Sequence, residues 1–360
     1  MTWLNLGQLI PEQKDCLLSR LALNYDPSND TLYNAKGVTL DTNVDFGGAG
    51  GVAYVDPSLK KAMPYFGVMI DNLTSTLGYR IGVDLHGAGY DWRLGPIGHT
   101  QSSAPGGYYA KLANLIETSV LKNQARAHLV THSLGGPTTL AFLQLQGTDW
   151  VEKHVASFIP LSAPWIGGAS MAKTECGGDN LGEPIPHDYL MPVQREAESG
   201  VFIMPVGTEG WGTEPMVRTP SKNYTVDELP AMFQDLNLTQ TFQLYNRLKE
   251  AKLLASQLKP PSCPTHVMYS KGVKTGRVFL YDKDFSAKNN DLKVKKTISG
   301  DGDGTVNIES LVWAEKAWTN KSDVTFFHVE NVEHIGTVSN PQILGKIIEI
   351  VSASNNDNNI

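Results

Sequence analysis

Short apolar runs alternate along the chain with longer stretches in which apolar residues recur at helical spacing. The runs are typical of buried strands and lie at residues 80–86, 126–131, 155–162, 265–270 and 324–330. The helical stretches fall between and beside them, at residues 63–77, 107–121, 137–146 and 340–352. Because strands that alternate with helices form mostly parallel sheets, the pattern predicts an α/β fold.

Residues from about 170 to 262 interrupt this alternation. They are rich in Gly, Pro and Glu and contain the apolar stretch "VFIMPVGTEGWGTEPM". We interpret them as an inserted cap or lid over the edge of the sheet and not as a separate domain. The polar tail at residues 352–360 is predicted to be disordered.

Composition and charge exclude several classes of function. The chain has 360 residues, 41% of them hydrophobic, which is enough for a large core. The formal net charge is −7, and the absence of a basic block argues against nucleic acid as a partner. Three cysteines make neither a disulfide framework nor a metal site. No apolar run is long enough to span a membrane, and Met1 is not followed by a recognisable signal peptide.

A glycine-rich stretch, "DFGGAGG" at residues 45–51, loosely fits a dinucleotide-binding loop. The residues that follow contain two prolines and no clear helix, which such a loop would need. We therefore expect no cofactor.

The sequence "HLVTHSLGG" at residues 128–136 places Ser133 between a predicted strand and a predicted helix. This is the context of a nucleophile elbow, a sharp turn that exposes a serine hydroxyl group. Gly135 and Gly136 leave room for the turn, and Pro137 suits the first turn of a helix. The backbone N–H of Leu134 is then placed to bind a developing oxyanion. An ordinary serine in a strand-to-helix loop remains the alternative.

A nucleophilic serine needs a base and a carboxylate that orients the base. His334 lies in "NVEHIG", in a loop just after a predicted strand near the C-terminus, and is the best candidate for the base. The carboxylate is expected in the loop "SGDGDGTV" at residues 299–306. A calcium loop is excluded there because Val312 stands where a bidentate glutamate is required. A plain turn remains possible.

Several motifs together resemble one family. They are "GAGYDWRLGP" (87–96), "THSLGG" (131–136), "PLSAPWIGGA" (160–169), "GGDNLGEPIP" (177–186), "TPSKNYT" (219–225), "DGDGTV" (301–306) and "EHI" (333–335). Their order and separations are similar to those of lecithin:cholesterol acyltransferase and lysosomal phospholipase A/acyltransferase, and the similarity runs from about residue 25 to 350.

The resemblance implies an α/β-hydrolase with a cap, which cuts an acyl chain from a glycerophospholipid and passes it to water or a lipid alcohol. It implies Ser133 as nucleophile, His334 as base and Asp303 as acid, because the family's aspartate directly precedes the G-T-V step. The segment that holds Trp211 corresponds to the family's mobile lid.

The resemblance also implies how the chain is divided and where it acts. Residues 1–36 correspond to a membrane-binding segment, and residues 37–351 to the hydrolase domain with its inserted cap. The expected partners are a phospholipid, a membrane or lipoprotein surface and a lipid alcohol acceptor, whereas the oligomeric state is left open. Family members are mostly secreted, lysosomal or membrane-associated.

Three departures from the family pattern give rise to alternatives. Thr131 replaces a small residue, and the family's N-terminal lid disulfide has no matching cysteines. The family's early strand, with its P-G-x-x-G loop that gives a second oxyanion donor, would lie before the start of this sequence. A catalytically impaired lipid-binding relative is therefore the alternative to an enzyme, and an esterase for small soluble esters is a third hypothesis.

Overall fold

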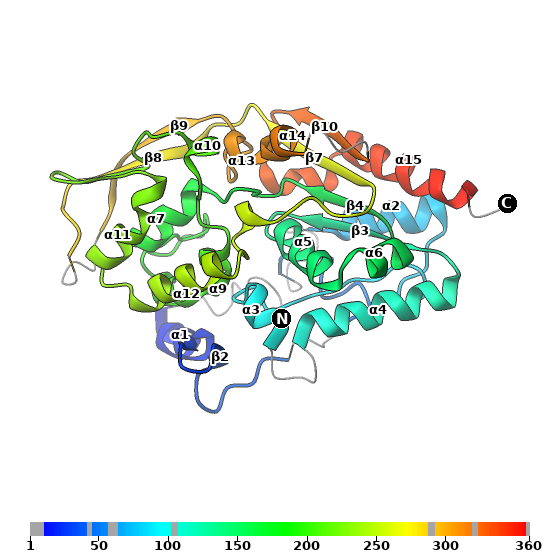
Figure 1. Ribbon diagram of the computed structural model, residues 1–360, viewed down its shortest axis with the longest axis horizontal. Coiled ribbons are helices and arrows are strands. Elements are labelled where there is room, and N and C mark those ends of the chain that lie inside the picture. Colours follow the sequence, from blue (N-terminus) through cyan, green and yellow to red (C-terminus); the bar gives the residue numbers. More distant parts are fainter. Residues whose placement is uncertain are drawn as a thin grey trace.

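The computed structural model describes residues 11–41, 45–56, 64–101, 107–286, 292–318 and 323–357. Figure 1 shows its helices and strands. The helices are α1 (Lys14–Leu21), α2 (Gly67–Leu77), α3 (Pro96–Gln101), α4 (Gly107–Asn123), α5 (Gly135–Gln146), α6 (Thr148–His154), α7 (Ala169–Gly177), α8 (Met191–Glu196), α9 (Glu198–Phe202), α10 (Thr208–Trp211), α11 (Leu229–Asp235), α12 (Thr239–Glu250), α13 (Ile308–Leu311), α14 (Trp313–Ala317) and α15 (Pro341–Asp357). The strands are β1 (Leu23–Asp26), β2 (Thr31–Asn34), β3 (Ala127–His132), β4 (Val155–Leu161), β5 (Val217–Arg218), β6 (Asn223–Tyr224), β7 (Thr265–Lys271), β8 (Thr275–Tyr281), β9 (Val294–Gly300) and β10 (Val324–Glu330).

The main sheet has four parallel strands in the order β10-β7-β4-β3. Their registers pair Val324 with Thr265 at one end of the sheet and His132 with Leu161 near the other. These strands correspond to four of the five predicted runs. Since parallel strands all end at the same edge, the loops after β3, β7 and β10 approach one another there.

Helices cover both faces of this sheet, as an α/β fold requires (Figure 1). Phe158 and Val267 point to one face and pack with helices α4, α5 and α6. Ile159 and Met268, each the next residue along its strand, point to the other face and pack with α2 and α15. The two-residue period of the strands therefore divides the apolar side chains between two cores. This arrangement is that of an α/β-hydrolase.

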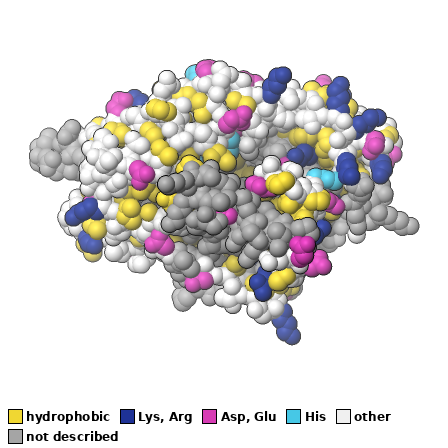
Figure 2. All heavy atoms as spheres, turned by 180° about the vertical axis from the view of Figure 1, so that it is seen from behind, with side chains coloured by type: hydrophobic (Ala, Val, Ile, Leu, Met, Phe, Trp, Pro, Cys, Tyr) yellow, Lys and Arg dark blue, Asp and Glu magenta, His cyan; other side chains and the backbone are white. Residues whose placement is uncertain are grey.

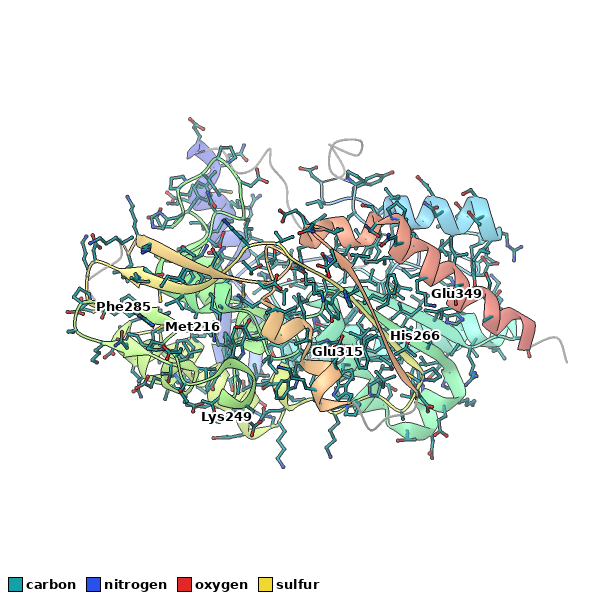
Figure 3. The ribbon with its side chains drawn as sticks, turned by 90° about the horizontal axis from the view of Figure 1, so that it is seen from above. Met216, Lys249, His266, Phe285, Glu315 and Glu349 are labelled. Atoms are coloured by element: carbon teal, nitrogen blue, oxygen red, sulfur yellow. The ribbon has the colours of Figure 1, made fainter. Side chains whose placement is uncertain are left out.

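A second sheet, with the order β6-β5-β8-β9, lies at the other end of the molecule together with helices α7 to α12. Met216 and Phe285 mark this end in Figure 3, and His266 and Glu349 mark the opposite one. The strands β8 and β9 pair antiparallel, so this second sheet reaches residue 300, whereas the bounds of the cap at about 170–262 stay a prediction. A hairpin of β1 and β2 adjoins the cap.

Two other sequence-based expectations differ from the structure. Residues 80–86 form no strand of the sheet: Gly82 adopts φ 75°, and one isolated bridge joins Ile81 to Leu85. A left-handed glycine in the middle of the run interrupts extended backbone. Helix α15 extends to Asp357, into the tail predicted to be disordered.

The part of the predicted membrane-binding segment at residues 1–10 lies outside the described residues. Among the helices that the structure describes, none combines the length and the apolar character that crossing a membrane requires. Figure 2 shows acidic and basic side chains spread among hydrophobic ones over one face, in keeping with a sequence that lacks a basic block.

Candidate active site

Ser133 lies on the turn between β3 and α5, at the carboxyl end of the main sheet. Its φ is 55°, in the left-handed region that costs an L-residue about 1–2 kcal/mol. The turn is held by the Ser133 N–H, which donates to the carbonyl oxygen of Leu161 on β4 at 2.9 Å, and by the Gly136 N–H, which donates to the Ser133 carbonyl oxygen at 2.9 Å. Such retained strain is common where a fold presents a nucleophile.

The two glycines after Ser133 have different surroundings. A Cβ atom added to Gly136 would lie 2.5 Å from Ala163 Cβ, whereas one added to Gly135 would lie 3.5 Å from Thr131 Cβ. The helix therefore packs against the segment after β4 through Gly136. Thr131, the departure from the usual elbow pattern, is accommodated in this arrangement opposite Gly135.

Asp303 and His334 are brought together from two different loops. His334 Nδ1 lies 2.7 Å from Asp303 Oδ2, and the His334 backbone N–H donates to the Asp303 carbonyl oxygen at 2.8 Å. Both side chains are buried, with Asp303 0% exposed. Since the carboxylate can only accept, Nδ1 carries the proton, and Nε2 is left to act as a base.

The loop that holds Asp303 also fixes its second carboxylate oxygen. Oδ1 accepts the backbone N–H groups of Thr305 at 3.1 Å and Val306 at 2.7 Å. Asp301 makes no such contact with His334: its Oδ1 accepts the N–H groups of Gly272 and Gly302 in an exposed turn. The two aspartates of "DGDG" thus have separate partners.

Ser133 and His334 line the same cavity. Among the hydrogen bonds of the described residues, none joins Ser133 Oγ to His334. The backbone N–H of Leu134, the predicted oxyanion donor, belongs to the N-cap residue of α5. An N–H in this position has no acceptor within the helix and is free for an anion.

His132, the residue before Ser133, contacts His334 directly. The two ring centroids are 4.5 Å apart, and His132 Nε2 lies 3.1 Å from the His334 carbonyl oxygen. On its other side His132 Nδ1 lies 2.6 Å from the Tyr65 hydroxyl oxygen. Burial, and then the proximity of His334, hold the pKa of His132 well below its usual value, so this ring is neutral at pH 7.

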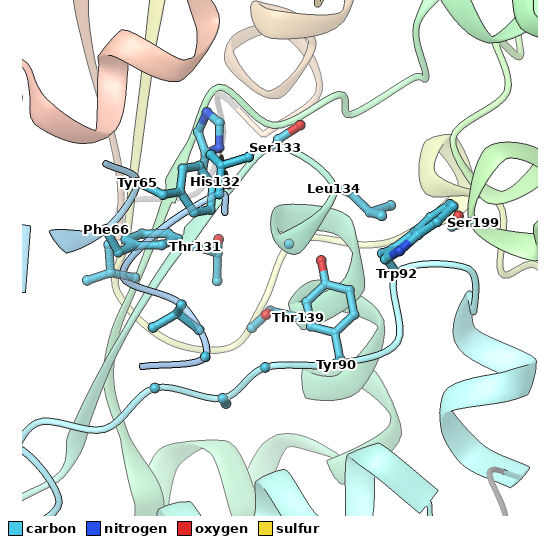
Figure 4. Close-up of a pocket in the computed structure, with 18 of the residues that line it drawn as sticks. Tyr65, Phe66, Tyr90, Trp92, Thr131, His132, Ser133, Leu134, Thr139 and Ser199 are labelled. Carbon is cyan, nitrogen blue, oxygen red and sulfur yellow. Dashed lines mark hydrogen bonds between the residues drawn. The ribbon is translucent and has the colours of Figure 1, made fainter. Parts of the chain in front are cut away.

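The cavity beside Ser133 has a volume of about 1880 Å³. It extends along β3, where every residue from Ala127 to Ser133 lines it, and is walled by apolar side chains of α2 and α4 such as Leu73 and Ile116. Figure 4 shows Ser133 on its turn, with Trp92, Leu134 and Ser199 to one side and Tyr65, Phe66 and His132 to the other. Because β3 is the edge strand of the main sheet among the described residues, this cavity joins the space beside Ser133 to the unpaired edge of the sheet.

Buried polar contacts hold the wall that carries Trp92. The neighbouring Arg93 is 0% exposed and pairs with both carboxylate oxygens of Asp91, at 3.0 and 2.7 Å. It also donates to Asn34 Oδ1 at 2.6 Å, on the β1–β2 hairpin. Further along, Glu198 accepts three backbone N–H groups at residues 95–98, although burial raises the pKa of Glu198 to about 7.

Trp211, the candidate lid residue, is buried in the cap. Its indole Nε1–H donates to the Ile166 carbonyl oxygen at 2.9 Å, and the Arg277 guanidinium group lies 5.4 Å from the ring centroid. Trp211 is not among the residues that line the cavity in the described part of the chain. A movement that exposes it stays a prediction.

Sequence reasoning did not identify His132, Tyr65 or Arg93 as members of the site. His132 directly precedes the serine, but position alone does not separate a functional histidine from a satisfied core residue. Tyr65 is 67 positions away from His132 along the chain, so only the fold brings the two together. Arg93 lies within the motif "YDWR", which a buried ion pair now explains.

Comparison with known proteins identifies the relatives of this chain. The family model for lecithin:cholesterol acyltransferase matches residues 1–346. Lysosomal phospholipase A and acyltransferase of Rattus norvegicus is 31% identical over 97% of this chain and 81% of its own length. Lecithin-cholesterol acyltransferase-like 1 of Arabidopsis thaliana is 31% identical over 98% of this chain and 80% of its own length.

The phosphatidylcholine-sterol acyltransferase of Gallus gallus is 30% identical over 93% of this chain and 78% of its own length. Among solved structures, a chain of the Tle4–Tli4 complex has a TM-score of 0.49 at 13% identity, covering 95% of this chain and 79% of that chain. The motifs of the site and the match along nearly the whole sequence agree: the chain belongs to the lecithin:cholesterol acyltransferase family.

Proposed function

We propose that this chain is a phospholipase A-type acyl hydrolase and O-acyltransferase that acts through Ser133, His334 and Asp303. The observation that carries the proposal is the 2.7 Å contact of His334 Nδ1 with Asp303 Oδ2, on a histidine that lines the same cavity as Ser133. The names of the relatives support phospholipid as the acyl donor.

In the first half of the reaction, His334 Nε2 takes the proton of Ser133 Oγ as the oxygen atom attacks the acyl carbonyl carbon. Asp303 stabilises the imidazolium that forms, and the Leu134 N–H stabilises the oxyanion. His334 then protonates the departing lysophospholipid oxygen, which leaves the acyl group esterified to Ser133. The contact between Ser133 and His334 is expected to form with the bound substrate, since catalytic hydrogen bonds often tighten only then.

In the second half, His334 Nε2 removes a proton from water or from the hydroxyl group of a lipid alcohol. The resulting oxygen nucleophile attacks the acyl-enzyme ester, and Ser133 recovers its proton as the ester bond breaks. Water gives a fatty acid, and a lipid alcohol gives a new ester. The names of the relatives, a phospholipase A and acyltransferase and a phosphatidylcholine-sterol acyltransferase, support a lipid substrate over a small soluble ester.

The substrate is held in a membrane or a lipoprotein particle, so we propose that the enzyme works at such a surface. The test is the release of acyl groups from phosphatidylcholine vesicles by the wild type, Ser133→Ala and His334→Gln, each checked for folding. His266→Gln is the matched control, because His266, at the start of β7, contacts Thr325 on β10 and does not line the cavity. We expect loss of about a thousandfold or more in the first two variants and none in the control.

A catalytically impaired lipid-binding protein is the alternative outcome. In that case the wild type would bind the vesicles but release acyl groups no faster than Ser133→Ala. A fluorophosphonate probe that labels the wild type and Ser133→Ala equally would overturn the assignment of the nucleophile.

A further inference from the structure

The ring of His334, the proposed triad histidine, packs against the ring of a second histidine, His132. His132 ends β3, and its ring is tilted by 43° against the ring of His334, with the centroids 4.5 Å apart. Asp303 approaches His334 from another loop, through Nδ1. The position of the His334 ring is therefore set by Asp303 and by the ring of His132 together.

The contacts of His132 determine which of its nitrogen atoms carries the proton. Nε2 lies 3.1 Å from the His334 carbonyl oxygen, which can only accept, so Nε2 must donate. In the neutral ring Nδ1 is then an acceptor, and the Tyr65 hydroxyl group at 2.6 Å is the donor to it. The accept-only carbonyl oxygen of His334 thus fixes the tautomer of His132, and Tyr65 stabilises this tautomer by donating to Nδ1.

The backbone of His334 is fixed at both of its polar groups. Its carbonyl oxygen accepts from His132 Nε2 and from Thr337 Oγ1, the latter at 2.7 Å, which uses both lone pairs. Its N–H donates to the Asp303 carbonyl oxygen at 2.8 Å. Of these partners, His132 is the one joined directly to the nucleophile, since it is the residue before Ser133.

We propose that His132 is a positioning residue that sets the place of the His334 ring relative to Ser133, and that Tyr65 holds His132 in the required tautomer. This proposal rests on the Ser133–His334–Asp303 triad proposed above. The connection between Ser133 and His334 has two parts. His132 at the end of β3 is bonded covalently to Ser133, and its Nε2–H holds the loop of His334 through a hydrogen bond.

Loss of the hydrogen bond between His132 and the His334 carbonyl oxygen should lower the rate of the chemical step and leave the binding of substrate unchanged. His334 must transfer a proton at Ser133 Oγ in the transition state, and small errors in the position of a catalytic group lower that rate steeply. Both ring nitrogen atoms of His132 are already engaged, by the Tyr65 hydroxyl group and by the His334 carbonyl oxygen, which leaves neither for a hydrogen bond to the phospholipid in the ground state. Loss of this hydrogen bond is therefore expected to lower kcat and to leave KM nearly unchanged.

The experiment measures kcat and KM on phosphatidylcholine vesicles, and the rate constant for inactivation by a fluorophosphonate, in three variants. His132→Asn keeps a polar group near the position of Nδ1 but loses the donor to the His334 carbonyl oxygen. His132→Gln can place an amide N–H near the position of Nε2. Tyr65→Phe removes one hydroxyl group and keeps the ring against Phe66 and His132.

We expect His132→Asn to lower kcat and the inactivation rate about tenfold or more, with KM within about twofold of wild type. His132→Gln should recover part of the loss, and Tyr65→Phe should lose about threefold to fivefold. Two controls, His266→Asn and Tyr224→Phe, remove comparable side-chain hydrogen bonds to Thr325 and Asp235 outside the cavity and should react as the wild type does.

A folded His132→Asn variant with the kcat of the wild type, or with a raised KM and unchanged kcat, would overturn the proposal. If this variant does not fold, Tyr65→Phe decides, and wild-type rates in it would overturn the proposal equally. Peptide mapping of the labelled wild type distinguishes a failure of the proposed triad from a failure of the positioning role of His132. A label found away from Ser133 contradicts the triad and the role of His132 with it, whereas a label on Ser133 with wild-type rates in the variants contradicts the positioning role alone.

Discussion

The two adjacent glycines of the nucleophile turn should respond in opposite ways to the same substitution. An added Cβ atom at Gly136 meets Ala163 Cβ at 2.5 Å, which forces helix α5 and the segment after β4 apart. At Gly135 the nearest neighbours of the added atom, Thr131 Cβ at 3.5 Å and the Tyr90 hydroxyl oxygen at 3.8 Å, are at ordinary contact distance. Comparing Gly136→Ala with Gly135→Ala therefore distinguishes the effect of a steric clash from the effect of adding a methyl group to this turn.

The expected magnitudes follow from these contacts. Overpacking of a close-packed core costs about 1–3 kcal/mol, and Ala gains about 1 kcal/mol over Gly in a helix. Gly136→Ala should therefore lower the free energy of unfolding by up to about 2 kcal/mol, whereas Gly135→Ala should raise it by up to about 1 kcal/mol. Because the Gly136 N–H donates to the Ser133 carbonyl oxygen, the first variant should also displace the nucleophile.

The assay is urea unfolding of both variants, together with the rate of inactivation by a fluorophosphonate. Gly136→Ala should react at least about tenfold more slowly than wild type, and Gly135→Ala at a similar rate. Adding Ala163→Gly to Gly136→Ala removes the short contact, so a double-mutant cycle should give a favourable coupling energy of about 1 kcal/mol or more. Equal stabilities and rates in the two single variants, with no coupling to Ala163, would refute the reasoning.

Three further predictions concern buried groups around the cavity. Burial lowers the pKa of His99 to about 3, so His99 stays neutral in the folded protein but binds a proton in the unfolded chain below about pH 6.5. Between pH 7 and pH 5, the free energy of unfolding of His99→Phe, measured with urea, should therefore fall by about 2 kcal/mol less than that of the wild type. Equal losses would contradict this prediction. Arg93→Met leaves the Asp91 carboxylate buried without its ion-pair partner and should lower the free energy of unfolding by about 3–5 kcal/mol. The loss should be smaller when Asp91→Asn is added, and equal losses in the two variants would contradict a stabilising Arg93–Asp91 pair. Trp211→Ser should lower the free energy of unfolding by about 3–5 kcal/mol, because Trp211 is 2% exposed. If its segment acts as the predicted lid, the variant should lose more activity on vesicles than on short soluble esters, and equal losses would argue against a lid.

Much of the main sheet was predictable because its strands are short apolar runs, of which the central strands β4 and β7 are buried on both faces. β4 and β10, at Val155–Leu161 and Val324–Glu330, lie within one residue of the predicted bounds. The run at residues 80–86 has a similar composition but contains Gly82, whose left-handed backbone interrupts a regular strand. The second sheet was missed because its strands β8 and β9 follow the expected end of the cap, and β9 is largely exposed and has no apolar run.

The candidate site was predictable where a motif fixes a local turn. The turn at Ser133 and the loop of Asp303 both depend on glycines close in sequence, and such turns can be inferred from residue types. The contact between His132 and His334 spans 202 positions and arises from the packing of β3 against a distant loop. Contacts of this kind follow from the three-dimensional fold and have no local pattern in the sequence.

The proposed reaction depends on Ser133, which carries the acyl group between donor and acceptor. It is tested most directly by mixing the enzyme with vesicles of phosphatidylcholine that bears an isotope-labelled acyl chain, quenching in acid within milliseconds, and mapping the peptides by mass spectrometry. We expect an acyl ester on Ser133 that disappears when water or a lipid alcohol completes the reaction, and that is absent from Ser133→Ala. Product formed at the wild-type rate by Ser133→Ala, or an acyl group on another residue, would contradict it.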